Sequence, residues 1–274
     1  MTKPRYPIVF SDYDDTLTLP DGTITPRTLA AIKAYREAGG TFVVCTGRSY
    51  ASVKKLLPVV YGEPHPAVPV ICFQGGLVAD AEGNVIRREG MDRDEMIGLA
   101  AEAEARGMIA QVYSGDSMFV SRKNEASRRY EIITNCSFDE VGDLGEFIRT
   151  YPHPFDKILM IGSAEQVANG LKELPATRRF PRSKFVFSRP IYLEAIPASA
   201  GKDKAMLFLA KRLGRSADEI AAFGDSNNDM DMLRAAGLGV AVGNARPECK
   251  AVADLVAPPV TEDGLARTLE SFLA

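Results

Sequence analysis

Acidic residues follow two apolar runs of this chain, and their crowding calls for a positive partner. Asp12, Asp14 and Asp15 fill three of four positions after the run PIVF. Asp225 and Asp229 follow the run IAAF much later. Like charges this close repel, and each carboxylate resists losing its hydration. A hard divalent cation reverses the problem, because Mg²⁺ takes oxygen ligands and commonly bridges to a substrate phosphate. We therefore expect a Mg²⁺ site with ligands at Asp12, Asp14, Asp225 and Asp229.

Carboxylates at such a site can also do covalent chemistry on phosphorus. One carboxylate can attack a phosphate ester to form an aspartyl-phosphate. A second can protonate the leaving oxygen and later deprotonate the hydrolytic water. Residues i and i+2 of an extended segment point the same way, so Asp12 and Asp14 can converge while Asp15 faces elsewhere. The two histidines, His65 and His153, each stand between prolines, which favours a carboxylate as the acid–base group.

Alternating strand and helix patterns must position these side chains. The apolar runs YPIVF, TFVVC and VPVICF indicate buried strands, separated by helical segments over 25–40 and 50–57. Thr25 is the expected N-cap of the first helix, with Pro26 at its first position. A second series of helices and strands covers 202–244. This order, with nearly all-apolar strands, predicts an α/β core with a doubly wound, Rossmann-like parallel sheet covered on both faces.

The carboxyl ends of these strands are expected to bring distant polar residues to one edge of the sheet. Ligands bind at that edge in open parallel sheets. Asp12 and Asp14 follow the first strand, and Asp225 follows a strand near the C-terminus. Thr46 and Gly47 follow the second strand. One site is thus predicted from segments that lie far apart in the sequence.

The middle of the chain has a different pattern. Segments such as MIAQVYSGDSMFVSR and KFVFSRPIYLEAI indicate strand pairs joined by tight turns, with amphipathic helices between them. Hairpin pairing predicts a mixed or antiparallel sheet with helices on one face. We expect an inserted α+β domain over 85–192, within a core made of 1–84 and 193–274.

Composition is that of an ordinary globular protein. The 274 residues are 46% hydrophobic and 25% charged, with a formal charge of −3 and a pI of about 5.6, so no basic surface for nucleic acid is indicated. No apolar stretch approaches the roughly 18–20 residues that span a bilayer, and MTKPRYP lacks the apolar region of a signal peptide. Four scattered cysteines suit a reducing compartment. We expect a cytoplasmic protein with a small-molecule partner and neither nucleic acid nor membrane.

Four segments resemble the motifs of the haloacid dehalogenase (HAD) superfamily, specifically its Cof-type phosphatases with the α/β cap called C2B. DYDDTL is similar to the first motif, CTGR to the second, GKDKAMLFLAKRLG to the third and GDSNNDMDML to the fourth. The resemblance covers nearly the whole chain and makes 85–192 the cap domain. It implies a Mg²⁺-dependent phosphatase that hydrolyses a small phosphorylated metabolite, with sugar phosphates as the expected class.

The resemblance also implies catalytic roles. Asp12 would be the nucleophile and Asp14 the acid and base. The third motif offers two lysines, and counting back from LAKRLG selects Lys202, with Lys204 as the alternative. Lys202 would balance charge on the transferred phosphoryl group.

Binding roles follow from the same resemblance. Thr46 and the Gly47 amide would hold the phosphoryl group, and Asn228 would contact it. The Mg²⁺ ion would be bound by Asp12, the Asp14 carbonyl and Asp225, while Asp229 would order a metal-bound water or orient Lys202. Two departures stand out. Asp15 occupies a position where the family usually has Gly, and Gln-Gly-Gly at 74–76 replaces the usual Asn-Gly-Ala.

Other interpretations compete with these. Paired aspartates after a strand are often turn residues, and Arg48 is more simply a structural ion-pair partner. The basic segment SRKNEASRR fits a solvated face better than a substrate contact. Two other functions are open: a phosphotransferase of the phosphomannomutase type, which would pass the phosphoryl group to a sugar hydroxyl, and a non-catalytic sensor of a phosphorylated ligand.

Overall fold

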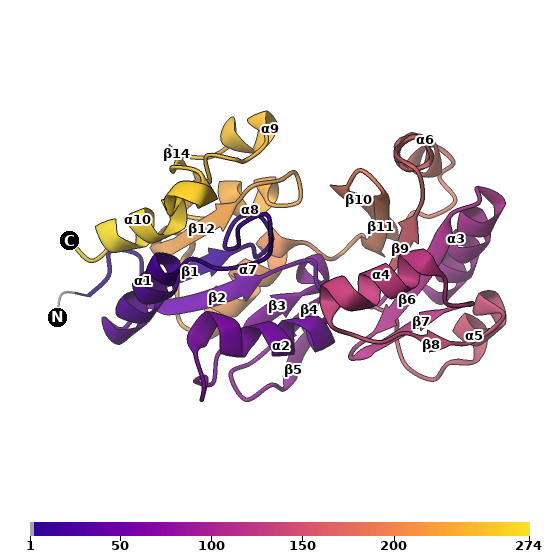
Figure 1. The fold of residues 1–274 in the computed structure, drawn as a ribbon, viewed down its shortest axis with the longest axis horizontal. Helices are drawn as coiled ribbons and strands as arrows, with labels where there is room; N and C mark the ends of the chain where they lie inside the picture. The colour runs from indigo at the N-terminus through magenta and orange to yellow at the C-terminus, as the bar shows by residue number, and fades with distance from the viewer. Residues whose placement is uncertain (1–2) are drawn as a thin grey trace. The chain divides into compact units, whose positions relative to one another are not determined.

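Two sheets organise the chain, each in a compact unit of its own (Figure 1). The structure, a computed structural model, describes residues 3–274 apart from the side chains at positions 133, 188 and 189. Unit 1 comprises Met1–Gly47, Leu56–Arg87 and Gly201–Ala274, and unit 2 comprises Arg48–Lys55 and Arg88–Ala200.

Unit 1 is built on a sheet of eight strands. The six strands from β14 to β3 in spatial order are parallel, and β4 runs antiparallel to β3. This arrangement confirms the predicted mostly parallel α/β core. In spatial order the strands are β14 (Leu255–Val256), β13 (Leu238–Ala241), β12 (Ile220–Gly224), β1 (Ile8–Ser11), β2 (Thr41–Cys45), β3 (Val70–Cys72), β4 (Leu77–Ala79) and β5 (Val85–Arg88).

Helices cover both faces of this sheet. Ile8 and Phe10 of β1 pack in a core with α7 and α8, whereas Val9 packs in a second core with α1 and α10. Because successive strand residues point to opposite faces, a strand buried on both sides must be apolar throughout. The helices are α1 (Pro26–Glu37), α7 (Lys202–Arg212), α8 (Met230–Ala235), α9 (Pro247–Lys250) and α10 (Gly264–Ser271), with short 3₁₀ turns η1 (Phe73–Gly75), η2 (Ala217–Glu219) and η3 (Val260–Glu262). A further helix, α2 (Tyr50–Tyr61), is divided between the units: residues up to Lys55 belong to unit 2 and those from Leu56 to unit 1.

The first and last residues of the helices can be compared with the predictions from sequence. Thr25 caps α1 as expected, because its side chain accepts the Thr28 amide at 3.1 Å, and Pro26 opens the helix. The second helix is longer than predicted, since α2 continues through Pro58 to Tyr61. Proline costs one helical hydrogen bond, but Leu57 and Val60 on either side of it are buried, and their burial holds the helix together.

Unit 2 is built on a six-stranded mixed sheet. Its strand pairs are antiparallel except for β7 with β8, which confirms the predicted second sheet. Helices α3, α5 and α6 pack on one face over a shared apolar core. Tyr130 of α4 contacts Tyr113 and Tyr192 on the other face, so the prediction of helices on one face alone is wrong. The strands in spatial order are β10 (Ser183–Arg189), β11 (Tyr192–Pro197), β9 (Lys157–Ile161), β6 (Ile109–Ser114), β7 (Ser117–Val120) and β8 (Asp139–Glu140); the helices are α3 (Arg93–Ala105), α4 (Glu125–Thr134), α5 (Leu144–Thr150) and α6 (Ala164–Ala176).

No helix within residues 3–274 has both the length and the apolar character needed to cross a bilayer.

Candidate active site

The acidic residues of unit 1 meet where the winding of the sheet reverses. β1 pairs with β2 on one side and with β12 on the other, so chain connections leave it in both directions. Crevices form at such switch points, and ligands bind there. Asp12 follows β1 and Asp225 follows β12. The Asp12 amide donates to the Phe223 carbonyl at 3.0 Å, which carries the β1–β12 pairing one residue into the loop.

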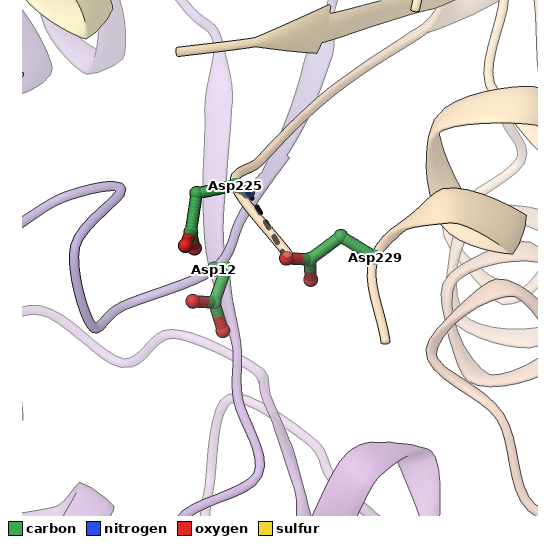
Figure 2. Close-up of side chains that lie close together, drawn as sticks. All are labelled: Asp12, Asp225 and Asp229. Atoms are coloured by element: carbon green, nitrogen blue, oxygen red, sulfur yellow. Dashed lines mark hydrogen bonds between the residues drawn. The ribbon is translucent and has the colours of Figure 1, made fainter. Parts of the chain in front are cut away.

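Three carboxylates converge at this point (Figure 2). Asp12, Asp225 and Asp229 each offer an oxygen, and these oxygens all lie within 4.8 Å of one another. Asp12 and Asp229 are buried, and Asp225 is half-buried. The sequence prediction that Asp12 and Asp225 lie at one edge of the sheet therefore agrees with the geometry.

Asp229 is held by the loop that carries Asp225. One carboxylate oxygen of Asp229 accepts the main-chain amides of Asp225 and Ser226, each at 3.1 Å; Figure 2 shows the first of these bonds. Asp229 also lies directly against Gly224. A Cβ at position 224 would come within 2.4 Å of the Asp229 Cβ, so the glycine is required for this close approach. Asp229 thus shapes the loop as well as adding charge.

Lys202 supplies the positive charge of the cluster. It is the first residue of α7, and its side chain is buried. Its Nζ lies 2.5 Å from Asp12 and 2.6 Å from Asp229. Burial by itself lowers the pKa of Lys202, but the two aspartates outweigh burial, so the pKa lies above its ordinary value. Lys204, the alternative in the sequence, is exposed.

Asp12 and Asp225 resist ionisation in this setting. Burial raises the pKa of Asp12 well above its usual range, and the neighbouring carboxylates add to this while Lys202 opposes it. Burial, together with Asp229, raises the pKa of Asp225 to about 7. Thr16 opposes that shift, because its hydroxyl donates to Asp225 at 2.9 Å. The cluster is therefore short of positive charge.

The donor set fits a hard divalent cation. All three side chains offer carboxylate oxygens, the ligands that Mg²⁺ prefers. Three carboxylates and one ammonium group leave two negative charges when all are ionised, and a divalent cation would neutralise them. The coarser prediction of an acidic metal site agrees with this arrangement.

The predicted phosphate-binding residues follow β2 and β12, the two strands that flank β1. Thr46 and Gly47 follow β2, next to β1 in the sheet. The buried Thr46 donates its amide to the Ile71 carbonyl at 2.9 Å and accepts the Gln74 amide at 3.1 Å. Asn228 lies in the loop between Asp225 and Asp229, and its amide donates to Gln74 Oε1 at 2.9 Å.

Asp14 lies outside the three-carboxylate cluster. It is half-buried in the turn after β1, and its charge adds to the raised pKa of Asp12. Asp15 adopts a left-handed conformation with φ 58°, a conformation that aspartate tolerates better than most side chains. Its carbonyl accepts the Asn244 amide at 2.7 Å. Asp15 therefore fits the turn that usually calls for glycine.

Sequence reasoning gave no role to three residues that shape this site. Thr16 orients Asp225, Gly224 makes room for Asp229, and Gln74 contacts Asn228. Thr16 stands within DYDDTL and Gly224 directly precedes Asp225, so both lie inside quoted motifs. No sequence signal pairs Gln74 with Asn228, because 154 positions separate them.

Comparison with known proteins assigns the chain to one class. The chain belongs to the haloacid dehalogenase-like hydrolases, whose family model matches residues 9–269. It is 31% identical to a Haemophilus influenzae protein named "putative phosphatase", over 97% of each chain. It is 27% identical to 5-amino-6-(5-phospho-D-ribitylamino)uracil phosphatase YwtE of Bacillus subtilis, over 96% of each. The fold matches that of the subclass IIB sugar phosphatase BT4131 with a TM-score of 0.82, at 22% identity over 97% of this chain and 98% of the other.

These matches confirm the predicted family. The chain is a haloacid dehalogenase-type hydrolase of the Cof type, and its enzyme class is that of the phosphatases, which hydrolyse phosphoric monoesters. The likeness to BT4131 supports the fold, with the second, mixed sheet expected of a C2B cap.

Proposed function

We propose that this enzyme hydrolyses the phosphate monoester of a small polyhydroxylated metabolite, of the sugar-phosphate class, with Mg²⁺ and through an aspartyl-phosphate on Asp12. The observation that carries the proposal is the Asp12 carboxylate, which lies 2.5 Å from the buried ammonium of Lys202 and within 4.8 Å of two further carboxylates. Phosphoryl transfer requires positive charge around the phosphoryl oxygens. At this position the ammonium of Lys202 supplies one such charge, and the carboxylates would hold a cation that supplies another.

The first step transfers the phosphoryl group to the enzyme. An Asp12 oxygen attacks phosphorus and forms the acyl phosphate bond, while the bond from phosphorus to the ester oxygen breaks. Asp14 gives its proton to the departing oxygen, so the product leaves as a neutral alcohol. Lys202 balances charge on the phosphoryl oxygens, and Thr46, the Gly47 amide and Asn228 hold them.

The second step returns the enzyme to its starting state. Asp14, now ionised, takes a proton from water as the water attacks phosphorus. The acyl phosphate bond breaks, inorganic phosphate leaves, and Asp12 is a carboxylate again. Mg²⁺, when bound at Asp12, Asp225 and the Asp14 carbonyl, would neutralise charge on the substrate. Asp229 keeps Lys202 and the Asp225 loop in place for both steps.

The substrate class is inferred from the relatives. The Bacillus subtilis relative is named for a phosphoribityl compound, and BT4131 is named a sugar phosphatase. Both names place the phosphate on a polyhydroxylated carbon chain. We infer the same class here.

A phosphoester screen tests the proposal. The purified chain is assayed for release of inorganic phosphate with and without Mg²⁺, against hexose, pentose and ribityl phosphates, nucleotides and phosphoserine. We expect Mg²⁺-dependent release that is fastest with the polyol and sugar phosphates, and none with Asp12→Asn. Release that favours nucleotides or phosphoserine would refute the substrate class. Turnover that requires a sugar bisphosphate primer would instead support the phosphotransferase.

A further inference from the structure

The loop after β3 has an unusual backbone that brings one amide side chain into unit 1's site. Phe73, Gln74 and Gly75 have consecutive φ values of 51°, 57° and 88°. Left-handed conformations are unfavourable for residues with a Cβ, and such residues cluster at functional sites. Gln74 is also buried, with 4% of its surface exposed. Burial of a long polar side chain on a strained backbone indicates a specific contact.

Gln74 contacts two of the loops that carry the predicted phosphate-binding residues. Its main-chain amide donates to the Thr46 carbonyl at 3.1 Å, and its side chain lies over Gly47. A Cβ at position 47 would come within 2.3 Å of Gln74 Nε2. On the other side, Gln74 Oε1 accepts the Asn228 amide at 2.9 Å, and Asn228 Oδ1 accepts the Ser226 hydroxyl at 2.5 Å. Gln74 therefore connects the β2 loop with the β12 loop.

The same turn also contacts the start of α7. A Cβ at Gly75 would come within 2.2 Å of the Gly201 carbonyl and 2.9 Å of the Lys202 amide. The left-handed turn thus packs against the residue whose side chain holds Asp12. This close approach explains why the backbone conformation is fixed on both sides of Gln74.

One half of the Gln74 amide is left for a ligand. Oε1 is occupied by Asn228, whereas Nε2 makes no hydrogen bond to any residue that the structure describes. Over the same residues, the fully buried side-chain polar atom without a partner is Gln111 Nε2, so Gln74 Nε2 is not sealed from solvent. A donor of this kind beside the Gly47 amide suits an anionic oxygen.

We propose that Gln74 is a further phosphate-binding residue: Oε1 fixes Asn228 against the Thr46–Gly47 loop, and Nε2 donates to an oxygen of the bound phosphoryl group. The inference rests on the proposed function, which places the phosphoryl group at Thr46, Gly47 and Asn228. It adds a contact at the position where the sequence departs from the usual Asn-Gly-Ala of the family.

Two substitutions separate this role from packing. Gln74→Met keeps the length of the side chain and still places a residue with a Cβ in the left-handed conformation, but it removes both polar atoms. Gln74→Glu keeps the acceptor for Asn228, removes the donor and adds a negative charge. The dissociation constant of inorganic phosphate is measured by calorimetry with Mg²⁺ present, alongside kcat and KM for p-nitrophenyl phosphate. We expect phosphate to bind about tenfold more weakly to Gln74→Met and more weakly still to Gln74→Glu, with a larger change in KM than in kcat.

Matched variants complete the experiment. Gln111→Met removes the amide of another buried glutamine, in unit 2, and should leave phosphate binding unchanged. Gly47→Ala keeps the main-chain amide but forces the Gln74 side chain aside, so it should weaken phosphate binding, and weaken it less in a Gln74→Gly background. If Gln74→Met fails to fold, Gln74→Asn replaces it. Asparagine tolerates the left-handed backbone but lacks the methylene needed to reach Asn228, so the same loss is expected.

The outcomes distinguish this inference from the proposed function. Wild-type turnover together with unchanged phosphate binding in Gln74→Met and Gln74→Glu overturns the inference and leaves the phosphatase proposal standing. Phosphate binding without turnover of any ester refutes the proposed function, and the variants still decide the role of Gln74. A wild-type protein that neither binds phosphate nor releases it overturns both.

Discussion

Among the residues that the structure describes, two lysines are buried beside carboxylates, one in each unit, and they differ in charge balance. Lys157 in unit 2 pairs with Glu194 at 3.0 Å and lies 4.8 Å from the centre of the Tyr113 ring. Lys202 in unit 1 lies between Asp12 and Asp229, with Asp225 close by. The first arrangement is matched one to one, and the second has two carboxylates in excess.

This difference separates a structural ion pair from a reactive site. A buried pair with matched charges stabilises each partner against desolvation and needs nothing more. In a cluster with excess carboxylates the negative charges repel one another, and a bound cation must relieve this repulsion. Burial and a raised lysine pKa are common to both lysines, so neither property alone marks the active site. The surplus of negative charge does.

The largest expected effect comes from the nucleophile. Asp12→Asn should lower Mg²⁺-dependent phosphate release by about 10⁴-fold or more, because the attacking carboxylate is lost. The variant should not unfold more easily than wild type, since Lys202 keeps Asp229 and the crowding of carboxylates is relieved. Phosphate assays and thermal unfolding measure the two properties. An active Asp12→Asn enzyme would refute the assignment of Asp12.

Removing the site lysine should have the next largest effect. Lys202→Met leaves three carboxylates without their ammonium partner, and we expect turnover to fall by about 10²–10³-fold. The matched control replaces the unit 2 pair with apolar side chains, as Lys157→Met combined with Glu194→Leu, and should keep turnover per folded molecule. Equal losses in the two proteins would contradict the distinction between the lysines.

Breaking the unit 2 pair should reduce stability. Glu194→Gln leaves the buried Lys157 without its carboxylate, and the free energy of unfolding should fall by about 3–5 kcal/mol. The double apolar replacement should recover most of this loss, because no buried charge remains. Urea denaturation measures both. A Glu194→Gln protein as stable as wild type would show that the Lys157–Glu194 pair does not stabilise the fold.

The two clusters should respond differently to pH. The folded pKa of Asp225, about 7, lies above its unfolded value; without metal, its contribution therefore disfavours folding increasingly as pH rises from about 4 to 7. Mg²⁺ requires the ionised form, so Mg²⁺ should bind about tenfold more weakly for each pH unit below 7. The rise in melting temperature on adding Mg²⁺, measured at pH 5.5, 6.5 and 7.5, should grow with pH. A rise that is constant over this range would contradict the assignment.

The unit 2 pair provides the internal reference for that experiment. Burial by itself lowers the pKa of Lys157, but Glu194 with Tyr130 and Tyr192 raises it above its ordinary value. A lysine with a raised folded pKa contributes its full stabilisation below its unfolded pKa of about 10.4 and loses it only as pH rises through the folded value. The contribution of the Lys157 ammonium should therefore stay constant between pH 5.5 and 7.5, with or without Mg²⁺.

The smallest expected effect sharpens the description of the metal site. Thr16→Val keeps the shape of the buried side chain but removes the hydroxyl that donates to Asp225. The pKa of Asp225 should rise, and Mg²⁺ affinity at pH 7 should fall by about threefold to tenfold, the usual range for one hydrogen bond. Titration with Mg²⁺ measures the change. A gain in affinity would show that Thr16 does not support the ionised form.

Local chemistry explains why much of this could be predicted from the sequence. Thr25 and Pro26 start α1 because their backbone preferences act within one turn, and the apolar runs become strands of a sheet buried on both faces. The end of α2 could not be predicted in that way. Proline ends most helices, but this one continues through Pro58, with Leu57 and Val60 buried on either side of it.

The sequence by itself determined the residue types at each strand end, and with them the oxygen-rich, phosphate-directed chemistry of the site. Only the tertiary structure decided that β1 and β12 are neighbours, that the Lys202 ammonium is buried between Asp12 and Asp229, and that Gln74 reaches Asn228. The reason is physical. Strand and helix preferences act over a few residues, whereas charge balance and hydrogen bonding depend on distances between segments that only folding brings together.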